Sequence, residues 1–179
     1  MMKLIETKDG NYVEFYNDQT ITKVINPNES ICFYNEYGKK EKIIYKNGFT
    51  NFFGKNGKIT KIQFSNETTH FFNENGKLYK VTYVDGAIDF FDEKTRNLIK
   101  HIDSNGAIYF YNENGTINKI IRSDGSASYF NENEEVYKRI YSDGSIDFYD
   151  EKDGHIEMTI HQDKTIEYYD KNGNITKIK

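Results

Sequence analysis

The sequence predicts an all-β protein made of nine tandem β-hairpin repeats of about 19 residues, because three signals recur together along the chain. A pair of adjacent aromatic residues, an Asn-Gly or Asp-Gly turn and a short alternating strand pattern return every 18 to 20 residues. Nine such repeats fill the 179 residues. The aromatic pairs are Phe15-Tyr16, Phe33-Tyr34, Phe52-Phe53, Phe71-Phe72, Phe90-Phe91, Phe110-Tyr111, Tyr129-Phe130, Phe148-Tyr149 and Tyr168-Tyr169.

Each repeat is expected to form one hairpin. The first strand alternates in polarity, as in 87–91, and a turn such as 73–76 follows, whose glycine supplies the positive φ of a bulged hairpin turn. The second strand, as in 58–64, is rich in β-branched residues, and a second turn, as at Asp85-Gly86, leads to the next repeat. We therefore expect about eighteen strands in one repeat domain, residues 1–179, forming an elongated twisted sheet or a spiral solenoid.

The composition indicates a folded chain with a thin core. Hydrophobic residues make up 36% of the sequence and mean hydropathy is −0.82, yet 16% of the residues are aromatic, unlike a disordered chain. The net charge of −4 gives no general attraction to nucleic acid or anionic membranes. The single cysteine, Cys32, excludes an intramolecular disulfide. The polar N-terminus and the lack of a long apolar run predict a cytoplasmic protein without membrane insertion, with a secreted protein as the alternative.

Equivalent residues of the repeats should align in columns across the sheet. We expect the first aromatic of each pair and the nearby isoleucines to form the core face, together with the apolar residues that follow the turn, so that Phe71 would share a face with Leu78. The second aromatic should point to the other face. A lysine recurs in nearly every second strand: Lys23, Lys42, Lys61, Lys80, Lys100, Lys119, Lys138 and Lys177.

The second aromatics and the lysines are the candidate binding residues. A structural role is expected for both columns, since rings shield a sheet and lysine stems cover apolar surface. Their functional alternative is a row of rings that binds a partner and a row of amines that binds phosphates. The candidates are Tyr16, Tyr34, Tyr111, Tyr149, Tyr169, Lys61, Lys80, Lys100, Lys119 and Lys138.

No catalytic residue, metal site or cofactor is predicted. The sequence contains no nucleotide-binding loop, nucleophile elbow or zinc-binding helix motif. The histidines, His70, His101, His155 and His161, fall in four different columns, and the periodic carboxylates are expected on solvated faces. The protein is therefore predicted not to be an enzyme.

The stretch 169–178, Tyr-Asp-Lys-Asn-Gly-Asn-Ile-Thr-Lys-Ile, resembles the YD repeat of Rhs-type proteins, in which Tyr-Asp-x-x-Gly-x-Leu-x-x-Val is followed by Asp-Gly. The stretches 72–81 and 111–120 fit the same frame, with Asn in place of Asp. This resemblance implies a sheet of hairpins that acts as a shell or scaffold without catalysis. A second resemblance is to the cell-wall-binding repeats of choline-binding modules and clostridial toxin tails, but the chain lacks their tryptophan.

These observations predict a non-enzymatic binding or scaffold module that engages a macromolecule, with a protein as the expected partner. One specific form is a small bacterial or phage inhibitor or immunity protein that occludes a surface. The alternatives are a nucleic-acid binder that uses the lysine and aromatic columns and a glycan- or cell-surface-binding repeat protein.

Overall fold

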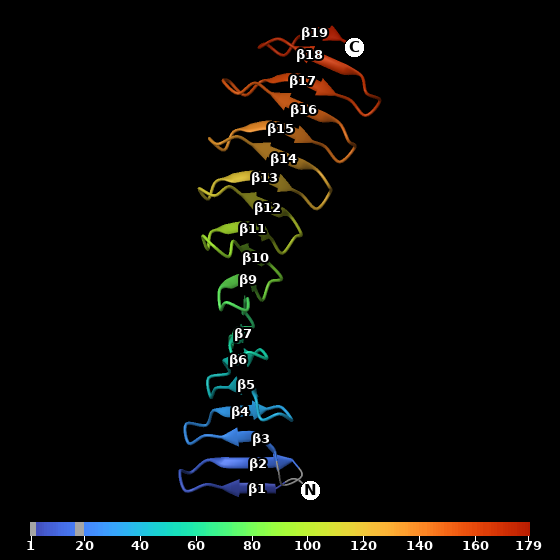
Figure 1. Ribbon diagram of the computed structural model, residues 1–179. Coiled ribbons are helices and arrows are strands. Elements are labelled where there is room, and N and C mark those ends of the chain that lie inside the picture. Colours follow the sequence, from blue (N-terminus) through green and yellow to red (C-terminus); the bar gives the residue numbers. More distant parts are fainter. Residues whose placement is uncertain (1–2, 17–19) are drawn as a thin grey trace. The chain divides into compact units, whose positions relative to one another are not determined.

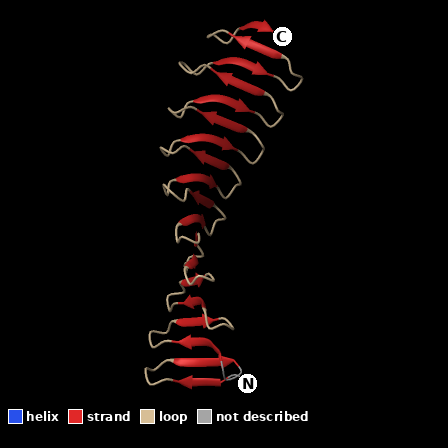
Figure 2. Cartoon of the chain, viewed as in Figure 1, coloured by secondary structure: helices blue, strands red, loops and turns tan. Residues whose placement is uncertain are grey.

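The computed structural model describes residues 3–16 and 20–179, and the regular elements in these ranges are all β-strands (Figure 2). The prediction of an all-β fold of tandem hairpins is confirmed. No helix in the described ranges could cross a membrane. The strands are β1 (Lys3–Glu6), β2 (Tyr12–Tyr16), β3 (Thr20–Ile25), β4 (Ile31–Tyr34), β5 (Lys40–Ile44), β6 (Thr50–Phe53), β7 (Ile59–Gln63), β8 (Thr69–Phe72), β9 (Leu78–Thr82), β10 (Ile88–Phe91), β11 (Leu98–Ile102), β12 (Ile108–Tyr111), β13 (Ile117–Ile121), β14 (Ala127–Phe130), β15 (Val136–Ile140), β16 (Ile146–Tyr149), β17 (Ile156–Ile160), β18 (Ile166–Tyr169) and β19 (Ile175–Ile178).

The chain divides into two compact units, residues 1–84 and 85–179. The first unit contains β1–β9 and the second β10–β19. Within each unit every strand pairs antiparallel with the next strand in the sequence, as Figure 1 shows. In the ranges 3–16 and 20–179, strands contact only these sequence neighbours within a unit, so this part of each unit is a single-layered sheet without a second packing layer. Whether the two units form the one domain expected from the repeats stays a prediction.

The turns explain why the glycine recurs. In the hairpin of β8 and β9, the amide of Gly76 donates to the carbonyl of Asn73 at 2.9 Å, and the amide of Asn73 donates to the carbonyl of Lys77 at 2.9 Å. This is a type I turn followed by a bulge residue in the left-handed region, and Gly76 has φ of 80°. The Asn73 side chain also accepts the amides of Asn75 and Lys77. Asn73 therefore stabilises the turn through its side-chain oxygen, and Gly76 does so by adopting a positive φ without steric cost.

Five turns in the described part of the chain have a left-handed residue that is not glycine. The sequence 131–134 lacks the expected glycine, yet Glu134 has φ of 61° and its amide still donates to the carbonyl of Asn131. The geometry is therefore kept by the two flanking strands at the expense of local strain. The non-glycine residues at this position are Glu29, Glu67, Arg96, Glu134 and Lys164.

A second bulge in each hairpin decides which side chains share a face. Phe71 pairs with Lys80, but Phe72 pairs with Leu78, so Tyr79 is an extra residue in its strand. One extra residue moves all following side chains to the other face. The predicted core face is therefore wrong in its second half, because Leu78 lies with Phe72 and Lys80 lies with Phe71. We call the face that carries Phe71 and Lys80, and the equivalent first aromatics and lysines of the other repeats from β4 onward, the lysine face, and the other one the opposite face. Met158 takes the place of the lysine in β17.

The most buried positions lie mid-strand on the opposite face. In β16, Asp147 is 6% exposed, whereas Ile146 and Phe148 on the lysine face are only half-buried. The same position holds the fully buried Ser128 in β14. The expectation that Ile and Phe columns form the buried core is therefore wrong. A single-layered sheet has no second layer to cover those columns. On the opposite face, rings can lie on either side of the middle position, as Phe64 and Phe72 do around His70.

Candidate interaction face

From β10 to β16, the lysine face of the second unit presents rings and ammonium groups in strict alternation, which ends at Met158 in β17. Lys100 in β11 is paired with Phe90 in β10 and with Phe110 in β12. The following strands repeat this arrangement, because each first strand brings a ring and each second strand brings a lysine to the same row. The order across β10–β16 is Phe90, Lys100, Phe110, Lys119, Tyr129, Lys138 and Phe148.

Each of these lysines lies over the rings of both neighbouring strands. Lys119 Nζ is 4.8 Å from the ring centroid of Tyr129 and 5.8 Å from that of Phe110. Lys138 Nζ is 5.4 Å from the centroids of both Tyr129 and Phe148. At this distance an exposed cation–π contact contributes about 0.5–1 kcal/mol. The ladder therefore stabilises the sheet and also holds the amines in fixed places.

The first unit has the same contacts. Lys61 Nζ is 3.7 Å from the centroid of Phe52, and Lys80 Nζ is 5.1 Å from that of Phe71. The lysine–ring contact therefore recurs in both units, because the bulge brings the lysine to the sheet face that carries the ring.

A strip of isoleucines runs beside the ladder on the lysine face. Ile102 pairs with Ile108, and Ile108 pairs with Ile121 on the next strand. The strip continues through Ala127 to Ile140 and Ile146. These side chains are half-buried, except Ala127, which is buried. The face thus offers apolar surface beside a row of positive charge.

The part of the lysine face between β10 and β16 carries one sign of charge. From β10 to β16 the residues paired on it are Ile, Ala, Phe, Tyr and Lys, with no Asp or Glu. The extra residues at the bulges there, Ile99, Asn118 and Tyr137, are also uncharged. The acidic residues of these strands, such as Asp89 and Asp147, lie on the opposite face. This part of the face is therefore cationic although the chain has a net charge of −4.

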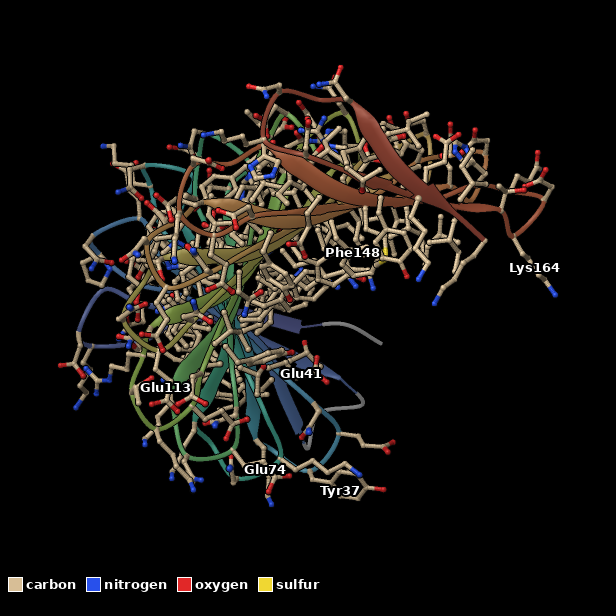
Figure 3. All side chains as sticks on the ribbon, turned by 90° about the horizontal axis from the view of Figure 1, so that it is seen from above. Tyr37, Glu41, Glu74, Glu113, Phe148 and Lys164 are labelled. Carbon is tan, nitrogen blue, oxygen red and sulfur yellow. The ribbon has the colours of Figure 1, made fainter. Side chains whose placement is uncertain are left out.

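Turn residues stand apart from this row. In Figure 3, Glu113 and Lys164 project from turns at the rim of the second unit, while Phe148 lies over its strands. Glu113 and Lys164 are exposed, and Phe148 is half-buried. The ladder is therefore flanked by polar turns.

The structure separates the candidate binding residues into two groups. The lysines lie on the lysine face, and they are Lys61, Lys80, Lys100, Lys119 and Lys138. The tyrosines lie on the opposite face, and they are Tyr34, Tyr111, Tyr149 and Tyr169. The side chain of Tyr16 lies outside the described residues. One ligand chain lying flat on one face cannot reach both groups.

The sequence reasoning missed the rings that frame the lysines, since it assigned Phe90, Phe110 and Phe148 to the core. A signal was present. The first strand of a repeat has four residues and the second has five, as in β12 and β13, and the odd residue has to form a bulge that changes the face.

The opposite face holds a polar row whose members bind one another. Asp147 Oδ1 accepts a hydrogen bond from the hydroxyl of Thr159 at 2.7 Å, and Oδ2 accepts one from the hydroxyl of Tyr141 at 2.6 Å. In β10 and β11, Nδ1 of His101 lies 2.6 Å from Oδ1 of Asp89. These buried or half-buried carboxylates are satisfied by neighbouring side chains, as a structural role requires.

Two tyrosine pKa values on the opposite face reflect these contacts. The hydrogen bond to Asp147, together with burial, raises the pKa of Tyr141 to about 12. Burial, and the nearby carboxylate of Asp89, raise the pKa of Tyr111. Both shifts favour the protonated hydroxyl, and that of Tyr141 donates to Asp147.

One group in the described part of the chain could supply metal ligands. Asp150, Asp153 and His155 place a ligand atom each within 4.8 Å of one another. Asp150 Oδ1 already accepts the amides of Lys152 and Asp153, and Asp153 contacts Nδ1 of His155. These bonds shape the turn, and the hydrogen bond to Asp153 raises the pKa of His155. The absence of a metal site stays a prediction.

Comparison with solved structures shows the fold. The wild-type TCP10 domain of Danio rerio CPAP is similar to this chain with a TM-score of 0.65 and 19% identity, over 99% of this chain and 99% of that one. The same domain in complex with a peptide of Danio rerio STIL gives a TM-score of 0.51 and 18% identity, over 99% of this chain and 93% of that one. No protein-family model matches the sequence, and the comparison with curated proteins gives no significant match.

Proposed function

We propose that this chain is a non-enzymatic module that binds a segment of a partner protein on its lysine face. The observation that carries the proposal is the ladder of lysines and rings from β10 to β16, beside an isoleucine strip, with no second layer over it within the unit. Ordered aromatic side chains and adjacent apolar surface are typical of protein-binding surfaces.

A domain of similar fold supports this proposal. The TCP10 domain of Danio rerio CPAP has been solved in complex with a peptide of STIL. Peptide binding is therefore known for a domain of similar fold, although the identity of 18% carries no binding residue over to this chain.

The finer predictions from the sequence remain proposals. They are membership of the YD-repeat family and the role of a bacterial or phage inhibitor or immunity protein. The glycan alternative would require sugars to stack on the opposite face, on Tyr111 and Tyr149. The nucleic-acid alternative would use the lysine face and competes directly with a protein partner there.

Selection of peptides from a displayed random library against the whole chain tests the proposal. Tyr129 and Tyr111 form a matched pair, since they lie on the lysine face and the opposite face of nearby strands. Selected peptides should lose about fivefold or more in affinity on Tyr129→Ala and less than about twofold on Tyr111→Ala. Circular dichroism should show that both variants are folded. Failure to enrich any peptide, or loss of binding on Tyr111→Ala alone, would overturn the proposal.

A further inference from the structure

We infer that the segment bound on the lysine face is acidic and extended, and that it carries a carboxylate at every third residue, over Lys100, Lys119 and Lys138. This inference rests on the proposed function and names the chemistry of the partner. It goes further in fixing the direction of the bound chain, which would cross the strands of β11–β15.

The first support is charge complementarity. Lys100, Lys119 and Lys138 each contact the rings of the two neighbouring strands. None of the three takes part in an ion pair found among the described residues. A lysine ammonium group has three donors, so contact with a ring leaves N–H groups free for a carboxylate. No acidic residue is paired on this face between β10 and β16, so a carboxylate that binds these lysines would come from a partner.

The second support is spacing. The lysines lie on every second strand, and strands are about 4.8 Å apart, so neighbouring ammonium groups recur at roughly 9.6 Å along the row. A chain in the polyproline II conformation rises about 3.1 Å per residue with three residues per turn, so every third side chain points the same way at about 9.3 Å. A β-strand cannot match this row, because its same-face side chains recur at about 6.6 or 13 Å. The repeat of the sheet therefore selects a chain with a three-residue period.

The third support is the acidic rim. Glu113, Glu132 and Glu134 are exposed residues of the turns at one end of these strands, and Asp143 belongs to a turn at the other end. In the turn 92–97 the two acidic residues are offset by Lys94 and Arg96. The charge of the acidic rim repels a broad polyanion that would overhang the strand ends. A narrow chain that follows the middle of the strands avoids them. This favours an acidic polypeptide over a nucleic-acid duplex.

Four capped twelve-residue peptides test the inference by fluorescence anisotropy with the full chain at low salt. The first repeats Glu-Pro-Ala four times, and the second has the same composition with the four glutamates at alternate positions. The third repeats Gln-Pro-Ala, and the fourth repeats Lys-Pro-Ala. The first peptide should bind about fivefold or more tightly than the second, and the third and fourth should bind more weakly still. Its affinity should fall as salt rises.

Two triple variants locate the site. Lys100→Gln/Lys119→Gln/Lys138→Gln removes the row, and Lys94→Gln/Lys152→Gln/Lys171→Gln removes three exposed turn lysines of the same unit and changes net charge equally. The first triple variant should lower the affinity for the Glu-Pro-Ala peptide about tenfold, and the second should leave it within about twofold. Matched melting curves should show that both variants keep the fold.

Several outcomes would overturn the inference. Equal binding of the period-three and alternate-position peptides would reject the spacing, and equal binding of the Gln-Pro-Ala peptide would reject the charge. Tighter binding of a single-stranded oligothymidine, lost in the first triple variant only, would assign the lysines to nucleic acid. Selection of neutral peptides that depend on Tyr129 would reject the inference while preserving the proposed function.

Discussion

The hydroxyl of Tyr141 donates a 2.6 Å hydrogen bond to Oδ2 of Asp147, whose residue is 6% exposed. The second oxygen of this carboxylate is held by Thr159. A carboxylate at a buried position in a thin sheet is stable only when such donors replace water. The hydrogen bond therefore links the end of β15 to the middle of β16 on the opposite face.

Tyr141→Phe should lower the free energy of unfolding by about 1.5–2 kcal/mol, because it leaves one oxygen of the buried carboxylate without its donor. Urea denaturation followed by circular dichroism measures this loss. Tyr137→Phe serves as the control, since Tyr137 is 37% exposed and its hydroxyl makes none of the hydrogen bonds found in the described ranges. The control should stay within about 0.5 kcal/mol of the natural chain. Equal effects of the two changes would contradict a structural role for the Tyr141 bond.

The same bond predicts an alkaline dependence. The pKa of Tyr141 is raised from 10.0 to about 12, first by the hydrogen bond to Asp147. Its contribution to stability is complete below the unfolded pKa and is lost as pH rises through the folded one. The stability difference between the natural chain and Tyr141→Phe should therefore shrink between pH 10 and pH 12. If this stability difference stayed constant between pH 10 and pH 12, Tyr141 would have the same pKa in the folded and unfolded states.

Turn aspartates predict the acid limb of stability. The hydroxyl and the amide of Ser145 hydrogen-bond to Asp143 Oδ1 and lower the pKa of Asp143. The amide of Thr165 acts in the same way on Asp163. A lowered pKa gives stability that is present above the unfolded value and is lost as pH falls through the folded value. Stability should therefore decline below about pH 4.

Asparagine provides the control for this dependence, because equivalent turns already use it. Asn114 Oδ1 accepts the amide of Thr116 in the same geometry. Asp143→Asn/Asp163→Asn should keep the turns and make the decline below pH 4 shallower. A decline as steep as in the natural chain, measured by denaturant midpoints across pH, would place the acid-sensitive groups elsewhere.

The left-handed turn position predicts two changes of opposite sign. Glu67 has φ of 68°, so Glu67→Gly should raise the free energy of unfolding by about 0.5 kcal/mol by removing strain. Gly144 has φ of 89° with no heavy atom within 4 Å of an added Cβ, so Gly144→Ala should cost about 1 kcal/mol through backbone conformation alone. Thermal and urea unfolding of both variants check the signs. A stabilising Gly144→Ala would contradict the assigned turn.

Deletion of residues 106–124 should leave a folded, shorter protein. The deletion removes one 19-residue repeat from the second unit and joins Asn105 to Gly125, which restores an Asn-Gly turn. Because strands of a unit contact only their sequence neighbours, no distant contact is lost. Far-ultraviolet circular dichroism should keep its strand signal with a cooperative melt. Loss of that melt would indicate packing beyond nearest neighbours.

The hairpins, the turns and the all-β fold class could be predicted from the sequence, because the aromatic pairs and the turn glycines recur with the same period. Which side chains share a face of the sheet could not be predicted. The position of Leu78 depends on one extra residue, Tyr79, and a bulge has no composition of its own. The same shift decides whether Lys119 joins Tyr129 or Tyr111, so the ladder could not be predicted from residue columns alone.

The turns that keep a left-handed residue without glycine have an evolutionary consequence. Glu29, Arg96 and Lys164 show that a long charged side chain can hold the position that glycine holds elsewhere. The turn position therefore fixes the backbone conformation more strictly than the identity of the residue. The sequences of such repeats can therefore diverge until little sequence identity is left, while each hairpin still pairs with its neighbour.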